Sequence, residues 1–184
     1  MAASAIRRRQ ALFLTLDHNN TGALDWDDFA RSAEVIRAER GWAPDHQLHQ
    51  GLLHAMRGFW DELAARVDRD KNGRISASEW MEFHGAMAEE VRELGRVPLW
   101  GLGLLQGIHA VLDLDGNGTI DADEYAVWLR AIDSTHDAAA AFKLLDADGD
   151  GLLGFDELER LYRSWLLDEG ADAPAADLFT GAPA

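Results

Sequence analysis

The chain has 184 residues and a formal net charge of −16, with 33 acidic residues against 17 lysines and arginines. Such an acidic surface disfavours nucleic acids and anionic membranes, so we expect neither as a partner. The absence of cysteine excludes a disulfide framework and thiol redox chemistry. No apolar run has the length of a membrane span or of a signal peptide, so we expect a cytoplasmic protein. A chain of this length can form one compact unit or two small lobes.

In chain order, the first notable segment is an oxygen-rich stretch at residues 17–28, with apolar residues in helical spacing on both sides. Two helical patterns follow at 28–40 and 46–66. They are separated by Gly41–Trp42–Ala43–Pro44, and Asp45 is placed to cap the second helix. The first half of the chain therefore predicts helices joined by polar loops.

A second oxygen-rich stretch lies at residues 68–79 and leads into another helical pattern. That helix is expected to end near Gly95, because Pro98 disfavours helical backbone at the residue before it. A new apolar run starts at Leu99, and a last helix is expected to continue to Leu167. We expect an N-terminal unit over residues 1–96 and a C-terminal unit over 97–184.

Four segments share one twelve-residue pattern. Each has Asp at position 1, Asp or Asn at position 3, Asn, Asp or Thr at position 5, Gly at position 6 and a carboxylate at position 12. This is the pattern of the EF-hand calcium loop, in which oxygen atoms surround a hard cation at roughly 2.3–2.6 Å. One match could arise by chance, but four in one chain could not. The segments are 17–28, 68–79, 113–124 and 146–157.

The predicted ligands are side-chain oxygens at positions 1, 3, 5, 9 and 12 and the backbone carbonyl at position 7. In the first loop they are Asp17, Asn19, Thr21, Ala23, Asp25 and Asp28. In the second loop they are Asp68, Asp70, Asn72, Arg74, Ser76 and Glu79. In the third loop they are Asp113, Asp115, Asn117, Thr119, Asp121 and Glu124. In the fourth loop they are Asp146, Asp148, Asp150, Leu152 and Glu157, with water expected in place of a side chain at Gly154.

The first loop differs from the others because Asp28 stands where they have Glu. Aspartate is one methylene shorter, so it reaches the ion with two oxygens only if the loop tightens. A smaller shell suits Mg²⁺ better than Ca²⁺. We therefore expect three to four calcium ions, with weak calcium binding, Mg²⁺ or no ion in this loop.

The expected fold class is all-α, with four EF-hands in two pairs and a compact globular arrangement. The residue at position 8 of each loop can form a short strand with its partner loop. We expect Leu24 beside Ile75 and Ile120 beside Leu153. His109 and Ser32 are the two residues that interrupt the apolar pattern flanking the loops.

The uneven spacing of the loops, the aromatic-rich helices and the tail after the fourth loop resemble the sarcoplasmic calcium-binding protein family, including its bacterial calerythrin-like members. The resemblance implies two lobes packed face to face, with the C-terminal segment against the interior. It also implies a calcium buffer. Within that segment, Leu178 and Phe179 are the apolar residues that we expect to dock. Coelenterazine-binding photoproteins share this general architecture.

Three functions compete at this stage. The first is a monomeric calcium buffer with a closed core, which the scarcity of methionine favours, because sensors of many targets use Met-rich grooves. The second is a calcium sensor that exposes an apolar surface to a protein partner, which the sequence does not identify. The third is a photoprotein-like oxygenase with an aromatic ligand cavity. The seven tryptophans fit a large core more simply, and no catalytic motif stands apart from the loops, so we do not expect an enzyme.

Overall fold

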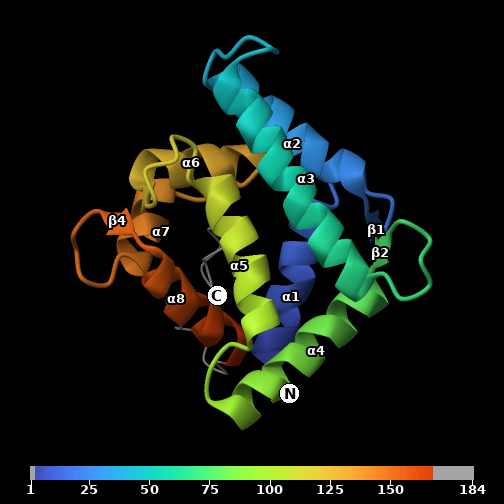
Figure 1. Cartoon of the computed structure of the whole chain (residues 1–184). Helices are drawn as coiled ribbons and strands as arrows, with labels where there is room; N and C mark the ends of the chain where they lie inside the picture. The colour runs from blue at the N-terminus through green and yellow to red at the C-terminus, as the bar shows by residue number, and fades with distance from the viewer. Residues whose placement is uncertain (1–2, 168–184) are drawn as a thin grey trace.

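A computed structural model describes residues 3–167 of the chain, and in that range it consists of eight α-helices and four two-residue strands (Figure 1). The helices are α1 (Ala3–Leu16), α2 (Trp26–Glu39), α3 (Gln47–Val67), α4 (Ala77–Leu94), α5 (Leu99–Leu112), α6 (Ala122–Ala131), α7 (Ala138–Leu145) and α8 (Phe155–Leu167). The strands are β1 (Ala23–Leu24), β2 (Ile75–Ser76), β3 (Ile120–Asp121) and β4 (Leu152–Leu153). The predicted all-α class is confirmed, and each predicted loop lies between two helices.

The strands pair as predicted. In the antiparallel pair β1–β2, Leu24 lies opposite Ile75, and in β3–β4, Ile120 lies opposite Leu153. All four side chains are buried. The two strand pairs lie on opposite sides of the molecule, with β1 and β2 on the right and β4 on the left of Figure 1. The four loops are therefore arranged as two pairs.

The breaks between helices follow the sequence signals, with one correction. The C-cap of helix α4 is Gly95, whose φ of 68° is a left-handed conformation that glycine adopts at little cost. Pro98 occupies the N-cap position of α5 and makes no side-chain capping hydrogen bond. The predicted cap of α3 at Asp45 is wrong. His46 occupies that position, and its Nδ1 atom accepts a hydrogen bond from the Leu48 amide at 3.3 Å.

One apolar core joins the two halves of the chain. Its main cluster includes the buried strand residues of both pairs together with Trp60, Trp80 and Trp165. A second, smaller cluster joins α2 and α3 to α5 and α6, with Ile36 and Val127 among its members. Helix α3 packs on α5, α2 on α6 and α4 on α8. The lobes thus lie face to face, as the resemblance implies. The boundary at residues 96 and 97 stays a prediction, and Leu178 and Phe179 lie outside the described residues.

Helix α1 is held by both halves of the chain. The Nη2 atoms of Arg8 and Arg9 donate to the carbonyl oxygens of Trp165 and Leu166, each at 3.1 Å. The indole Nε1 of Trp80 donates to the Arg9 carbonyl at 2.9 Å. Since α1 leads into the first loop and α8 follows the fourth, the two arginine bonds connect the first hand of the chain with the last, and the Trp80 bond connects it with the second. Over the described residues, no helix combines the length and apolar character needed to cross a membrane.

Candidate metal centres

In each of the first three loops, position 9 is the N-cap residue of the exit helix, which begins at the next residue. Asp25, Ser76 and Asp121 are the N-caps of α2, α4 and α6. In each case the cap side chain accepts from the backbone of position 12, and the position-12 carboxylate accepts from the cap backbone. This reciprocal capping box stabilises the helix start and turns the position-12 carboxylate back toward the loop. Sequence reasoning gave position 9 a ligand role and missed this capping role, although the Asp/Ser-x-x-Asp/Glu spacing signals it.

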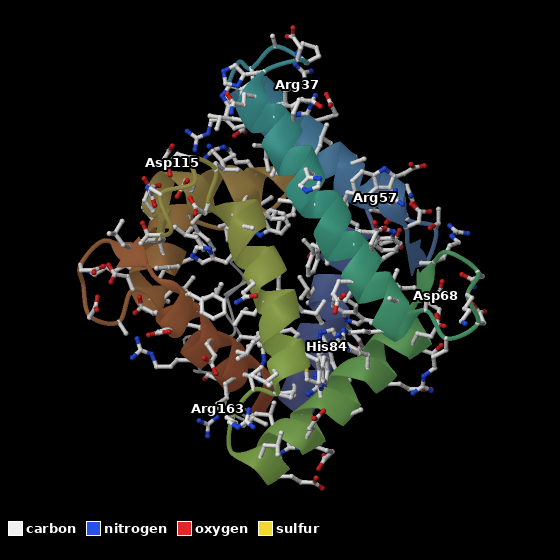
Figure 2. All side chains as sticks on the ribbon, in the orientation of Figure 1. Arg37, Arg57, Asp68, His84, Asp115 and Arg163 are labelled. Carbon is white, nitrogen blue, oxygen red and sulfur yellow. The ribbon has the colours of Figure 1, made fainter. Side chains whose placement is uncertain are left out.

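In three of the loops, the acidic side chains converge on one point. Their ligand atoms lie within 4.8 Å of one another, which is the spacing needed to share one cation. The converging sets are Asp68, Asp70 and Glu79; Asp113, Asp115 and Glu124; and Asp146, Asp148 and Glu157. Figure 2 shows Asp68 and Asp115, members of two of these sets, on opposite sides of the molecule. Each set can hold a calcium ion.

Backbone amides fix the ligand oxygens in place. In all four loops the amide of the position-6 glycine donates to the position-1 aspartate, at 2.8–2.9 Å. These glycines have φ between 79° and 89°, which a side chain would strain. In the second loop, the Arg74 amide also donates to Asn72 Oδ1 at 2.8 Å. Because the amides hold one lone pair of each ligand, the remaining lone pairs are free for a hard cation.

The position-12 carboxylates of loops two and three lie in different electrostatic environments. Glu124 is buried, and this burial raises the pKa of its carboxyl group. The Ser76 hydroxyl donates to Glu79 at 2.6 Å and, with the Ser76 amide, lowers the pKa of the Glu79 carboxyl. A divalent cation would offset the cost of a charged Glu124, because it supplies the opposite charge that the loop lacks. The chemistry of the loops therefore fits calcium.

The first loop departs from the other three at position 12. In those loops, one oxygen of the glutamate accepts from the position-2 amide at 2.7–3.0 Å. The shorter Asp28 instead accepts from the position-3 amide, Asn19, at 3.4 Å. Burial raises the pKa of the Asp28 carboxyl, and the charges of Asp25 and Asp17 act in the same direction. The loop has the predicted ligand types, but its closing carboxylate is the least well placed of the four.

His18, at position 2 of the first loop, has a structural role that the sequence did not indicate. Its Nε2 atom lies 2.9 Å from the Ser32 hydroxyl, which explains the polar residue in the otherwise apolar pattern of α2. Its Nδ1 atom lies 3.7 Å from Asp133, in the connection between α6 and α7. Burial lowers the pKa of His18, with the Arg31 charge acting in the same direction. The first loop therefore contacts the C-terminal half directly.

Comparison with known proteins supports this assignment of the loops. The family model of the EF hand matches residues 65–84, 110–129 and 138–162, which contain the second, third and fourth loops. Calerythrin of Saccharopolyspora erythraea is 31% identical over 163 residues, or 85% of this chain and 88% of that protein. A calcium-binding protein of Streptomyces coelicolor has a TM-score of 0.67 at 28% identity, over 88% of this chain and 97% of that one. A sarcoplasmic calcium-binding protein from amphioxus has a TM-score of 0.68 at 17% identity, over 99% and 98% of the two chains, and shows a shared fold.

Proposed function

Because the chain belongs to the calerythrin and sarcoplasmic calcium-binding protein family of EF-hand proteins, we propose that it is a calcium buffer that becomes more compact when it binds the ion. Calcium is the ion that the loops select, since all their ligands are oxygens and each loop supplies a carboxylate at both ends. The buffering role depends on what the bound ion does to the rest of the molecule.

The observation that supports a buffer most strongly is the joint core. The strand residues Leu24 and Ile75 and their counterparts Ile120 and Leu153 belong to one apolar cluster. A sensor must present an apolar groove when loaded, whereas here the apolar faces of the two pairs cover each other. Large exposed apolar side chains in the described residues, such as Leu14, Leu99 and Leu144, lie on three different helices. Calcium binding is therefore expected to consolidate the core.

The ligand sets predicted from the sequence remain our proposal for the four sites. Loops two to four are proposed to bind calcium through the side chains at positions 1, 3, 5 and 12, the carbonyl at position 7, and position 9 directly or through water. The converging carboxylates and the amide bonds to Asp68, Asp113 and Asp146 support this assignment. The first loop is proposed to be the weakest calcium site, or to bind Mg²⁺, because Asp28 closes it poorly.

A calcium sensor is the second candidate function. The Streptomyces coelicolor protein, which is similar over 97% of its length, is described in the context of prokaryotic calcium-mediated regulation. A regulatory protein would open on binding calcium and expose apolar surface to a partner. The photoprotein-like oxygenase is a remote third candidate, and we propose calcium binding without a catalysed reaction. A monomer in the cytoplasm remains our expectation, to be checked by size-exclusion chromatography and cell fractionation.

Hydrophobic-dye fluorescence and thermal melting, each measured with calcium and with a chelator, distinguish the two main functions. The carboxylates of empty loops repel one another, so the calcium-free protein is expected to be looser and to bind more dye. Calcium should lower dye fluorescence and raise the melting temperature strongly, since an ion that binds only the folded chain stabilises it by mass action. Higher dye fluorescence in the calcium form, reversed by an amphipathic peptide, would instead assign the protein to the sensors.

A further inference from the structure

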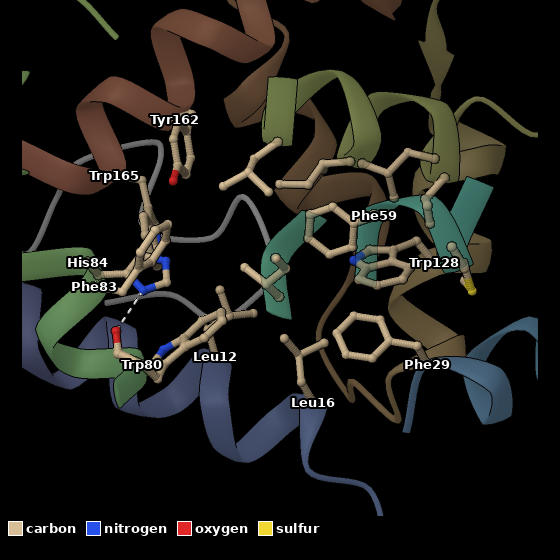
Figure 3. Close-up of a pocket in the computed structure, with 16 residues that line it drawn as sticks. Leu12, Leu16, Phe29, Phe59, Trp80, Phe83, His84, Trp128, Tyr162 and Trp165 are labelled. Atoms are coloured by element: carbon tan, nitrogen blue, oxygen red, sulfur yellow. Dashed lines mark hydrogen bonds between the residues drawn. The ribbon is translucent and has the colours of Figure 1, made fainter. Parts of the chain in front are cut away.

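A cavity lies in the core between the two halves of the protein, and the loops do not account for it. Its volume is about 70 Å³, and seven of the eight helices in residues 3–167, all except α7, contribute to its wall. Figure 3 shows the lining side chains, with His84, Trp80 and Trp165 toward one end and Trp128, Phe59 and Phe29 toward the other. A water needs about 10–15 Å³ by this measure, so the space exceeds a packing defect.

The cavity contains an unpaired hydrogen-bond donor. The indole Nε1 of Trp128 is buried, and it has no hydrogen-bond partner within residues 3–167. Trp128 and its neighbours Phe29, Phe59 and Met56 all line the cavity. A buried N–H group without a partner destabilises the fold, and such groups are rare in native proteins. A ligand that accepts a hydrogen bond would remove this cost.

None of the residues that line the cavity is charged, although the buried Arg9 lies close enough to lower the pKa of His84. Burial lowers the pKa of His84 to about 3, so its ring is uncharged at neutral pH. Its Nδ1 atom lies 3.0 Å from the Trp80 carbonyl, which can only accept, so the proton is on Nδ1 and the Nε2 atom has a lone pair. The other lining residues are apolar or aromatic. An ionised ligand would lose its hydration here without contacting a charged lining residue, since Arg9 is not in the wall and donates to the Leu166 carbonyl.

We propose that this cavity binds a small, uncharged, single-ring aromatic molecule that accepts a hydrogen bond from the Trp128 indole N–H. The aromatic walls favour a flat ring, and the unpaired donor selects a polar oxygen on it. The size limit follows from the volume, since a cavity of roughly 150 Å³ takes up benzene. About 70 Å³ admits a single ring only if a flexible side chain such as Met56 moves.

Calcium binding and ligand binding should be linked, because the cavity wall is built from helices that flank all four loops. If calcium compacts the core, as proposed above, it also assembles the wall. The aromatic ligand should then bind less tightly when calcium is removed, and by thermodynamic reciprocity it should raise the affinity for calcium. This link rests on the proposed function, whereas binding to the calcium-loaded protein does not.

The test uses the calcium-loaded full chain and three probes that share one ring. Acetophenone has an acceptor oxygen, ethylbenzene lacks it, and benzoate carries a charge. In titration calorimetry, acetophenone should bind about tenfold more tightly than ethylbenzene because it satisfies the buried donor, and benzoate should not bind. In ¹H–¹⁵N NMR spectra, acetophenone should move one indole N–H signal to the chemical shift of a hydrogen-bonded group. Ethylbenzene should not produce this change, because it has no acceptor atom.

The matched variants are Trp128→Phe and Trp100→Phe. The first removes the donor and keeps an aromatic ring. The second removes a tryptophan outside the cavity wall, whose Nε1 donates to Glu90. Trp128→Phe should remove the shifting indole signal and lower acetophenone affinity about tenfold, while Trp100→Phe should change neither. Equal affinities of the wild-type protein for acetophenone and ethylbenzene would overturn the proposal even if Trp128→Phe failed to fold. So would the absence of saturable binding, which would indicate a cavity that holds only water.

Discussion

Replacing Asp28 by Glu should convert the first loop into a calcium site similar to the other three. In the wild-type loop, Asp28 Oδ1 lies 3.4 Å from the Asn19 amide, whereas the glutamates of the other loops lie 2.7–3.0 Å from a loop amide. The added methylene extends the carboxylate by about 1.5 Å, which exceeds this difference. The longer side chain of the Asp28→Glu variant can therefore close the loop and offer two oxygens to the ion.

The Asp28→Glu substitution should have two opposing effects, one on calcium affinity and one on the stability of the calcium-free protein. Gaining a second carboxylate oxygen should raise calcium affinity about tenfold, or about 1.4 kcal/mol. Asp28 is only 2% exposed, so the extra methylene must be accommodated in packed surroundings, at a cost of about 1 kcal/mol. That cost should appear as lower stability without calcium. The variant should thus melt earlier than the wild type with a chelator, and the difference should shrink or reverse with calcium.

The position-6 glycine amides provide a separate readout for each loop. Gly22, Gly73, Gly118 and Gly151 each donate to the first aspartate of their own loop, so their NMR signals respond to local ion binding. A calcium titration with magnesium present should show Gly22 responding last in the wild type and earlier in Asp28→Glu. Asp27→Glu is the matched control, because Asp27 is exposed and is not a predicted ligand. If Gly22 responds first in the wild-type titration, the reasoning about Asp28 is wrong.

Three further predictions concern other parts of the molecule. Glu124→Gln should abolish tight calcium binding at the third loop in calorimetry, because it removes a charge and places an amide NH₂ near backbone donors. If the variant keeps all the tight calcium sites of the wild type, the assignment of Glu124 as a ligand is wrong. His84→Phe should flatten the acid side of the stability profile. Burial lowers the pKa of His84 to about 3 in the folded protein, against 6.5 in the unfolded chain. Because the unfolded chain therefore binds the proton first, the free energy of unfolding falls as the pH drops below about 6.5, by about 2 kcal/mol at pH 5. Chemical denaturation of the calcium-loaded protein between pH 5 and pH 7 should give a smaller slope for the variant, and equal slopes would refute the effect. Finally, Arg130 Nε lies 2.8 Å from both carboxylate oxygens of Glu39. Reversing either charge alone should lower the free energy of urea unfolding at low salt by about 0.5 kcal/mol, and exchanging the two residues should restore the wild-type stability. Additive losses in this exchange would show that this pair contributes nothing.

The loops and their pairing could be predicted because their determinants are local. A cation of fixed size needs oxygens at fixed positions within twelve residues, and the glycine at position 6 is required by a positive φ. The strand pairing follows from the apolar residue at position 8, since Leu24 and Ile120 each have one equivalent in the partner loop. These features depend little on the rest of the chain.

The contacts between the two halves could not be predicted, because they depend on how helices far apart in sequence pack. Nothing local in the sequence indicates that Arg8 and Arg9 are buried and donate to the end of α8. His46 replaced Asp45 as the cap of α3, and its ring also stacks on Trp42 with an interplanar angle of 1°. Local propensity ranks Asp above His at such a position, and the aromatic contact accounts for the difference.

The arrangement of the helices has a consequence for how the four loops communicate. Within each half, two loops share a strand pair, so an ion in one loop favours the loop geometry of its neighbour. Between the halves, α2 leaves the first loop and packs on α6, which leaves the third, and the pair Glu39–Arg130 joins these two helices. The first loop also contacts the α6–α7 connection through His18 and Asp133. An ion in the third loop should therefore influence the first loop, the proposed weakest site, through two routes: the packing of α2 on α6 and the contact of His18 with Asp133. Coupling of this kind would let a poorly closed loop fill only after the stronger sites have ordered the core, which extends the calcium range over which the protein takes up the ion.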